Sequence, residues 1–177
     1  MIKYKAFIAT SLDGFIARTD GSIDWLTSEE YVLGNNDFGY SSFMKSIDCI
    51  IMGRTTFEQV LTFEPYPFAS IPVYVLTRNS DYQYHSQFPI QIFYGSLNEL
   101  NSKLEKEKIK SAYVDGGKLI QSFIKESMMD SITITLIPVL LGSGLPLFAN
   151  LSKEIKLKHL ETSSFPNGFV QSLYHVY

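Results

Sequence analysis

Short apolar runs rich in β-branched residues recur along the chain, and segments with helical spacing separate them. One run, residues 47–52, stops at Gly53 and continues with the apolar positions of a helix over residues 53–62. The same succession returns at residues 112–114, Gly116–Gly117 and residues 118–128. The pattern therefore predicts two similar junctions, each a strand, a glycine turn and the start of a helix.

The other apolar runs predict the elements around these junctions. Strands are expected at residues 5–10, 15–17, 73–76, 92–94 and 132–137, the last continuing through 138–141. Helices are expected at residues 37–45 and after the capping box of Ser96 and Glu99, where Leu97, Leu100 and Leu104 share one face. Strand and helix alternate for most of the chain, which predicts a parallel sheet with crossover helices.

The C-terminal residues predict an antiparallel hairpin. Residues 156–163 and 169–177 flank Pro166-Asn167-Gly168, and Asn-Gly is a strong hairpin signal. If Asn167 and Gly168 are its centre, His159 pairs with Val176 and His175 with Leu160, so the two histidines lie on opposite faces. The predicted fold is thus a single α/β domain over residues 1–177, with a mostly parallel twisted sheet, helices on both faces and a closing hairpin.

Composition and charge limit the function classes. With 45% hydrophobic and 19% charged residues, the chain has the composition of a globular protein. A net charge of −3, a pI near 5.6 and no run of like charges argue against nucleic acid as a partner. The N-terminus lacks a secretory apolar region, and prolines and glycines interrupt the longest apolar stretch, residues 137–148. We expect a cytoplasmic protein that does not associate with membranes.

Metal and thiol chemistry are not expected. Cys49 is the lone cysteine and lies inside an apolar run, which favours a small buried side chain. His85 is isolated in the sequence, and His159 and His175 cannot share a ligand if they face opposite sides of the hairpin. No metal site is predicted.

The glycine junctions carry the chemistry that suits an anion. Backbone N–H groups are unpaired at the start of a helix, and Arg54 adds a planar, permanently charged donor. Arg78 follows the strand at residues 73–76, and the carboxyl ends of parallel strands meet at one edge. Two arginines there indicate a polyphosphate. A second interpretation stays open, because Thr55 and Glu58 also match a capping box that would only stabilise the helix start.

Two further residues have both a structural and a functional interpretation. Trp25, the single tryptophan, either fills the core or walls a pocket. Asp37 either caps the helix expected from residue 37 or presents its carboxylate to a ligand.

Five pieces of the sequence together resemble the dihydrofolate reductase-like superfamily. They are Ala9-Thr10-Ser11-Leu12-Asp13-Gly14 with Ile16-Ala17, Met52-Gly53-Arg54-Thr55-Thr56-Phe57, Val75-Leu76-Thr77-Arg78, Val114-Asp115-Gly116-Gly117-Lys118-Leu119 and Pro138-Val139-Leu140-Leu141-Gly142. Within that superfamily, the chain is more similar to the reductase domain of the bifunctional riboflavin-biosynthesis deaminase-reductase and its stand-alone bacterial relatives than to the dihydrofolate reductases. The resemblance spans nearly the whole chain and implies a three-layer dihydrofolate reductase-like fold.

The resemblance implies NADPH binding across the carboxyl edge of the sheet. Ala9 and Ile16 would flank the nicotinamide, and Gly53, Arg54, Thr55 and Thr56 would hold phosphates. The adenosine ribose and its 2′-phosphate would meet Leu76, Thr77 and Arg78. The diphosphate and nicotinamide side would meet Gly116, Gly117, Lys118, Leu119 and Ile120, in this superfamily often through a cis peptide at the glycine pair.

The resemblance also implies a substrate site. Asp37 falls where dihydrofolate reductases keep the acid that binds the pterin and favours its protonation, and Thr135 falls where they keep a supporting threonine. Trp25 would wall this site. Asp24 replaces the proline expected before that tryptophan, and Ser41 replaces an aromatic residue after the acid. These departures favour a broader reductase function over folate reduction.

Three functions remain open at this point. The leading hypothesis is an NADPH-dependent reductase of a pyrimidine- or pteridine-like compound, with 5-amino-6-(5-phosphoribosylamino)uracil, in riboflavin biosynthesis, as the family-typical substrate. The alternatives are a dihydrofolate reductase and a non-catalytic protein that binds or senses NADP(H). Hydride transfer needs positioning more than reactive side chains, so no catalytic triad is expected. The resemblance further implies a homodimer.

Overall fold

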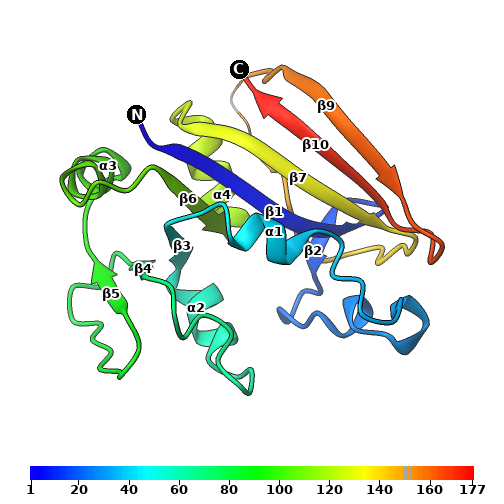
Figure 1. Cartoon of the computed structure of the whole chain (residues 1–177), viewed down its shortest axis with the longest axis horizontal. Helices are drawn as coiled ribbons and strands as arrows, with labels where there is room; N and C mark the ends of the chain where they lie inside the picture. Colours follow the sequence, from blue (N-terminus) through cyan, green and yellow to red (C-terminus); the bar gives the residue numbers. More distant parts are fainter. Residues whose placement is uncertain (150, 152) are drawn as a thin grey trace.

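An eight-stranded sheet forms the centre of the protein, which we describe from a computed structural model over residues 1–149, 151 and 153–177 (Figure 1). Its strands lie in the order β5-β4-β3-β6-β1-β7-β10-β9. Their bounds are β1 Lys3–Ser11, β3 Cys49–Gly53, β4 Val73–Leu76, β5 Ile90–Phe93, β6 Ser111–Asp115, β7 Met129–Ile137, β9 Leu157–Ser164 and β10 Val170–Val176. A separate two-stranded sheet pairs β2, Phe15–Ala17, with β8, Leu145–Pro146.

The direction of the strands confirms the predicted fold class. From β5 to β7 every neighbouring pair is parallel, and β10 and β9 are added antiparallel at one edge. Between β3 and β7 the helices α2 (Arg54–Val60), α3 (Leu97–Lys106) and α4 (Gly117–Lys125) form three of the crossovers, and α1 (Tyr40–Met44) precedes β3. The C-terminal hairpin extends beyond the helices (Figure 1).

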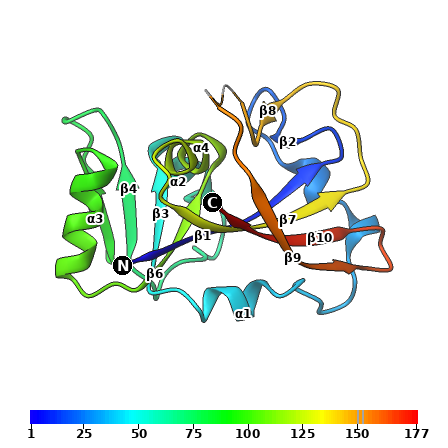
Figure 2. The same cartoon turned by 90° about the horizontal axis from the view of Figure 1, so that it is seen from above.

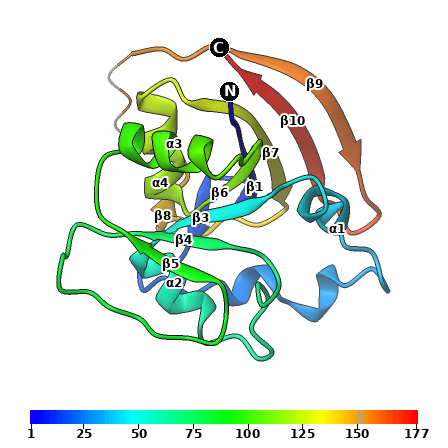
Figure 3. The ribbon, with the colours of Figure 1, turned by 60° about the vertical axis from the view of Figure 1, so that its left-hand side comes forward.

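Two apolar clusters show why the sheet has helices on both faces. Alternate residues of the central strands face opposite sides, so Ile51 and Val114 pack against the side chains of α3 and α4, while Ile50 and Met52 pack against α1 and α2. Figure 2 shows α1 and α4 on opposite sides of the sheet, and Figure 3 shows the same for α2 and α3. The three layers follow from this double burial.

Local signals in the sequence were reliable where they were strong. Ser96 and Glu99 form the predicted capping box at the start of α3, and Leu100 and Leu104 are completely buried beneath it. The helix predicted at residues 37–45 is shorter, because Gly39 takes a positive φ of 86° and the helix starts at Tyr40. Residues 138–141 do not extend β7, which ends at Ile137 before Pro138 removes a backbone donor.

The hairpin register differs from the expected one. A bulge at Leu160 moves the pairing by one residue, so His159 lies opposite Tyr174 and His175 opposite Lys158. The expected pairs with Val176 and Leu160 are therefore wrong. The two histidines still point to opposite faces, because His175 directly follows Tyr174.

The peptide bonds and the helices were each compared with a specific expectation from the sequence. The peptide between Gly116 and Gly117 is trans, whereas Glu64–Pro65 is cis. Within the described residues, no helix combines the length and the apolar character needed to cross a membrane.

Candidate active site

The two glycine junctions touch each other at the carboxyl edge of the sheet. Their strands are neighbours, with Met52 on β3 level with Asp115 on β6. Gly116 has a φ of 93°, and a Cβ atom there would lie 2.4 Å from the Oγ1 atom of Thr56. Only glycine fits between the two turns, so the backbone of one junction lies against the side chain of the other.

Cationic side chains surround this junction pair. The Arg54 guanidinium lies 5.6 Å above the ring of Tyr82, and its Nη1 atom is 3.9 Å from the Oε1 atom of Glu58. Arg78 follows β4 and is exposed, as is Lys118 in the first turn of α4. The carboxyl ends of three neighbouring strands therefore present three positive charges, with the Glu58 carboxylate beside Arg54.

The capping-box interpretation of this junction is wrong. Gly53 is the N-cap of α2, and no side chain caps it. Glu58 instead faces Arg54, and Thr55 is exposed to solvent. Thr55 is thus free of the structural role that the sequence left open.

The other residues proposed to bind the cofactor differ in how far they are buried. Ile16 meets the second junction directly, since a Cβ atom at Gly117 would lie 2.7 Å from its Cδ1 atom. Leu76 and Thr77 are partly buried where β4 ends beside Gly53. Leu119 is partly exposed, whereas Ile120 is completely buried and packs into the core with α3. Ile120 can offer a ligand only its backbone.

Asp13 joins two pieces of sequence that lie far apart in the chain. Its carboxylate accepts hydrogen bonds from the backbone N–H groups of Leu141 and Gly142, at 3.2 and 2.7 Å, and from the hydroxyl of Ser11 at 2.6 Å. These bonds fix the loop after β1 against the loop after β7. They hold β2 and β8 beside the second junction.

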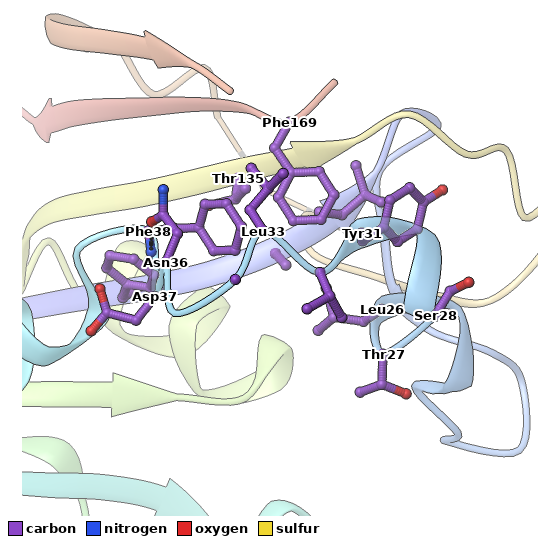
Figure 4. Close-up of a pocket in the computed structure, with 15 residues that line it drawn as sticks. Leu26, Thr27, Ser28, Tyr31, Leu33, Asn36, Asp37, Phe38, Thr135 and Phe169 are labelled. Atoms are coloured by element: carbon purple, nitrogen blue, oxygen red, sulfur yellow. Dashed lines mark hydrogen bonds between the residues drawn. The ribbon is translucent and has the colours of Figure 1, made fainter. Parts of the chain in front are cut away.

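A pocket of about 340 Å³ lies on the α1 side of the sheet (Figure 4). Its floor belongs to β1 and β7, and its walls belong to the segment 26–38 and to the residue before β10. The floor residues are Phe7, Ala9, Thr135 and Ile137. The wall residues with apolar or aromatic side chains are Leu26, Tyr31, Val32, Leu33, Phe38 and Phe169.

Asp37 lines the pocket at one end, and it also caps α1. Its Oδ1 atom accepts from the N–H of Gly39 at 3.0 Å and its Oδ2 atom from the N–H of Ser41 at 2.8 Å. The Ser41 hydroxyl and these two backbone bonds lower the pKa of the carboxyl below its usual value. Because Asp37 is exposed and ionised at neutral pH, it is suited to accept hydrogen bonds and unsuited to donate a proton.

Thr135 and Trp25 have different relations to the pocket. Thr135 is buried on its floor opposite Ala9, and its Oγ1 atom accepts from Gln171 Nε2 at 2.9 Å. Trp25 does not line the pocket. It is buried behind it, against Ile137 and Phe169.

Asp115 is the functional candidate that sequence reasoning missed. It is the last residue of β6, directly before the glycine pair, and burial raises the pKa of its carboxyl. The phenol groups of Tyr40 and Tyr113 lie around it, and the Tyr113 hydroxyl donates to the carbonyl oxygen of Phe7 at 3.0 Å. An acidic residue directly between an apolar strand and two glycines was the available signal.

Comparisons with known proteins identify the family of the chain. Residues 3–171 match the family model of the RibD C-terminal domain. The chain is 41% identical over 161 residues to the uncharacterized protein YwjB of Bacillus subtilis (strain 168), which covers 90% of each chain.

Solved structures show the same fold. A putative riboflavin biosynthesis protein from Shewanella sp. PV-4 is 34% identical, with a TM-score of 0.89 and 99% of each chain covered. Dihydrofolate reductase from Enterococcus faecalis, solved as a complex with NADP(H), is 18% identical with a TM-score of 0.67, over 98% of this chain and 96% of that one. The second likeness shows a shared dihydrofolate reductase-like fold and nothing more specific.

Proposed function

The chain belongs to the RibD C-terminal domain family, and we propose that it is an NADPH-dependent reductase of a pyrimidine- or pteridine-like heterocycle. One observation carries the proposal: the glycine junctions after β3 and β6 touch, and the floor of a pocket begins on the next strand, β1. A phosphate-rich cofactor and a planar acceptor would therefore meet at Ala9. The complex of the Enterococcus faecalis reductase with NADP(H) supports the choice of cofactor.

The carboxyl edge of the sheet at the two glycine junctions, with Arg54, Arg78 and Lys118, is called the crossover edge below, and its residues suit a dinucleotide. A Cβ atom at Gly53 would meet nothing within 4 Å, so the backbone of the first turn is open to a phosphate, while Gly116 lets the second turn pack directly against Thr56. Arg54, Arg78 and Lys118 supply positive charge around the two turns, with the Arg78 guanidinium proposed for the 2′-phosphate. When bound, a reduced nicotinamide would supply a hydride.

We assign different roles at the substrate to the carboxyl groups of Asp115 and Asp37. Asp115 keeps its proton to a higher pH than an ordinary aspartate, so we assign it the proton that must accompany the hydride. Asp37 stays ionised and accepts hydrogen bonds from the substrate. This assignment moves the acid role from Asp37 to Asp115 and leaves Asp37 as a binding residue.

Substrate-dependent oxidation of NADPH tests the proposal. The loss of NADPH absorbance is followed with 5-amino-6-(5-phosphoribosylamino)uracil, with its unphosphorylated form and with dihydrofolate. Oxidation with any of them supports a reductase and identifies its substrate. Tight NADPH binding without oxidation would favour the NADP(H)-binding or sensing protein, and no binding of NADPH would refute both.

A homodimer is proposed on family membership alone. Light scattering is expected to give about twice the 20.1 kDa mass of one chain. A particle of monomer mass would contradict it.

A further inference from the structure

The two-stranded sheet of β2 and β8 lies directly on the start of α4. A Cβ atom added to Gly117 would lie 2.7 Å from the Cδ1 atom of Ile16, on β2, and 3.4 Å from the carbonyl oxygen of Pro146, on β8. A Cβ atom added to Gly144, just before β8, would overlap the carbonyl oxygen of Ala17. Figure 2 shows the two strands beside each other. Both strands therefore pack against the second glycine junction.

The β2/β8 sheet is too small to hold its own position. β2 has three residues and β8 has two, and their pairing is irregular between Phe15 and Ala17. Isolated two-stranded sheets are marginally stable at best in water, so the place of this sheet depends on bonds to the rest of the protein. Two side chains supply such bonds, Asp13 at the turn before β2 and Gln121 on α4.

Asp13 ties the turn before β2 to the loop before β8. Its carboxylate accepts from the N–H groups of Leu141 and Gly142, which lie 128 and 129 positions away in the chain. The Ser11 hydroxyl, which donates to the same carboxylate, accepts from the N–H of Phe15, the first residue of β2. The bond from Ser11, followed by those from Gly142 and Leu141, lowers the pKa of the Asp13 carboxyl. Asp13 is therefore charged at neutral pH, and a turn that only stabilised itself would not need donors from so distant a loop.

Gln121 ties the other strand to α4. It lies four residues after Gly117, so the two residues share one side of the helix. Its Nε2 atom donates to the carbonyl oxygens of Leu147, at 2.9 Å, and of Pro146, at 3.3 Å. One side chain therefore holds the β2/β8 sheet at the turn before β2 and another at the end of β8, and Ile16 is held with the sheet against Gly117.

We propose that Asp13 and Gln121 are positioning residues, which act through the β2/β8 sheet to fix Ile16 where it meets the nicotinamide ring of the cofactor. The inference rests on the proposed function, with Ile16 beside the nicotinamide as the family resemblance implies. Arg54 and Arg78 follow β3 and β4, outside this sheet, so recognition of the phosphates needs neither positioning residue. Loss of either tie should therefore weaken binding of the nicotinamide end and leave binding of the phosphate end intact.

Calorimetric titration with two ligands measures the nicotinamide end separately. NADPH is compared with 2′-phospho-ADP-ribose, which keeps the adenosine, its 2′-phosphate and the diphosphate but lacks the nicotinamide. We expect the wild type to bind NADPH about 10-fold more tightly than this analogue, because a bound ring buries apolar area. Asp13→Asn and Gln121→Ala should each lose most of that factor, and both should bind the analogue within about 2-fold of the wild type.

Asp20→Asn and Ser122→Ala are the matched controls. The Asp20 carboxylate accepts hydrogen bonds within its own turn, and the Ser122 hydroxyl donates within α4. Neither bond reaches the β2/β8 sheet, so both controls should keep the wild-type ratio of the two dissociation constants. In the double variant of Asp13→Asn and Gln121→Ala, the loss should be smaller than the product of the single losses, because loss of either tie already releases the sheet.

The results separate this inference from the proposed function. If the wild type binds neither ligand, the proposed cofactor is refuted and this inference with it. If the wild type binds both ligands, the inference alone fails on any of three results: the wild type binds them equally, the variants keep the wild-type ratio, or the single losses multiply in the double variant. Equal losses for the two ligands would also overturn it, because Asp13 and Gln121 would then support the whole edge and not the nicotinamide end.

Discussion

The crossover edge and the pocket lie side by side but differ in charge and polarity. At the crossover edge, two partly buried glycine turns lie among the exposed side chains of Arg54, Arg78 and Lys118. In the pocket, apolar and aromatic side chains form most of the lining, with Asp37 at one end. One region therefore suits a phosphate-rich ligand and the other the faces of a flat ring. Under the proposed function, each region binds one of the two ligands, and the ligands meet at β1.

The same contrast appears in the two carboxyl groups. Asp37 stands at the exposed end of the pocket, where backbone N–H groups lower its pKa, and Asp115 stands between the regions, where burial raises its pKa. Environments that push two carboxyl pKa values apart give them different tasks. We therefore propose that Asp37 accepts hydrogen bonds from the substrate and that Asp115 donates the proton, although both are aspartates.

A side chain at Gly116 should impair cofactor binding at the crossover edge and leave substrate binding in the pocket unchanged. In Gly116→Ala the new Cβ atom meets Thr56 at 2.4 Å and takes a backbone conformation with φ of 93°. We expect kcat/KM to fall roughly 1,000-fold, because both cofactor binding and its placement suffer. Substrate titration without cofactor should change little.

Gly21→Ala is the matched control for backbone strain. Gly21 also has a positive φ, of 88°, but nothing lies within 4 Å of an added Cβ atom. Both variants should lose thermal stability through strain, about 1 to 2 kcal/mol each. If Gly21→Ala lost activity to the same degree, the contact with Thr56 would not be the cause.

Asp115→Asn should separate proton donation from binding. We expect turnover to fall roughly 100-fold, because an amide cannot supply the proton, while the Kd of NADPH changes less than about 3-fold. In the wild type, turnover should decline as pH rises through the raised pKa of Asp115. Asp37→Asn should weaken substrate binding and keep that pH profile. If Asp37→Asn removed the pH dependence instead, the two roles would be exchanged.

The raised pKa of Asp115 also predicts a change in stability. The folded protein favours the protonated form, so this carboxyl contributes stability at low pH that is lost as pH rises through its folded pKa. Asp115→Asn carries no ionisable group there. Thermal unfolding should therefore show the variant gaining stability relative to wild type as pH rises from about 4, the ordinary aspartate pKa, through the raised folded pKa. A constant difference across this range would contradict the burial of the charge.

Sequence patterns located the crossover edge far better than the pocket. Gly53, Arg54, Gly116 and Gly117 sit at the ends of buried strands, and parallel strands must bring those ends to one edge. The pocket instead depends on residues 26–38, an irregular segment without periodicity, and on Phe169, which directly precedes β10 near the other end of the chain. No local rule fixes where such a segment folds back.

The individual errors have the same origin. Trp25 was assigned to the substrate site or the core without a means to decide, and tertiary packing places it behind the lining. Asp115 has no signal in the sequence beyond its place between an apolar strand and two glycines. Burial raises the pKa of its carboxyl, and that burial exists only in the folded protein.

Arg78→Ala should sharpen the cofactor preference of the crossover edge. The guanidinium is proposed to meet only the 2′-phosphate, so we expect NADPH to bind about 10- to 30-fold more weakly and NADH less than about 2-fold. Fluorescence titration of both cofactors measures this. Arg18→Ala removes the same charge from a residue paired with Asp24 and serves as the control. Equal losses for both cofactors would exclude Arg78 from this role.

Thr135→Val should give the smallest effect and test the pocket floor alone. Valine keeps the shape but removes the hydroxyl, which leaves Gln171 Nε2 without its acceptor. We expect a loss of about 1 kcal/mol in the free energy of unfolding and roughly 5-fold weaker substrate binding, with the Kd of NADPH unchanged. Thr133→Val, on the same strand and face but outside the pocket, should leave substrate binding intact. If the two variants bound substrate equally well, Thr135 would serve only the pairing of β7 with β10, and the acceptor ring would have to be held by Asp37 and the aromatic walls.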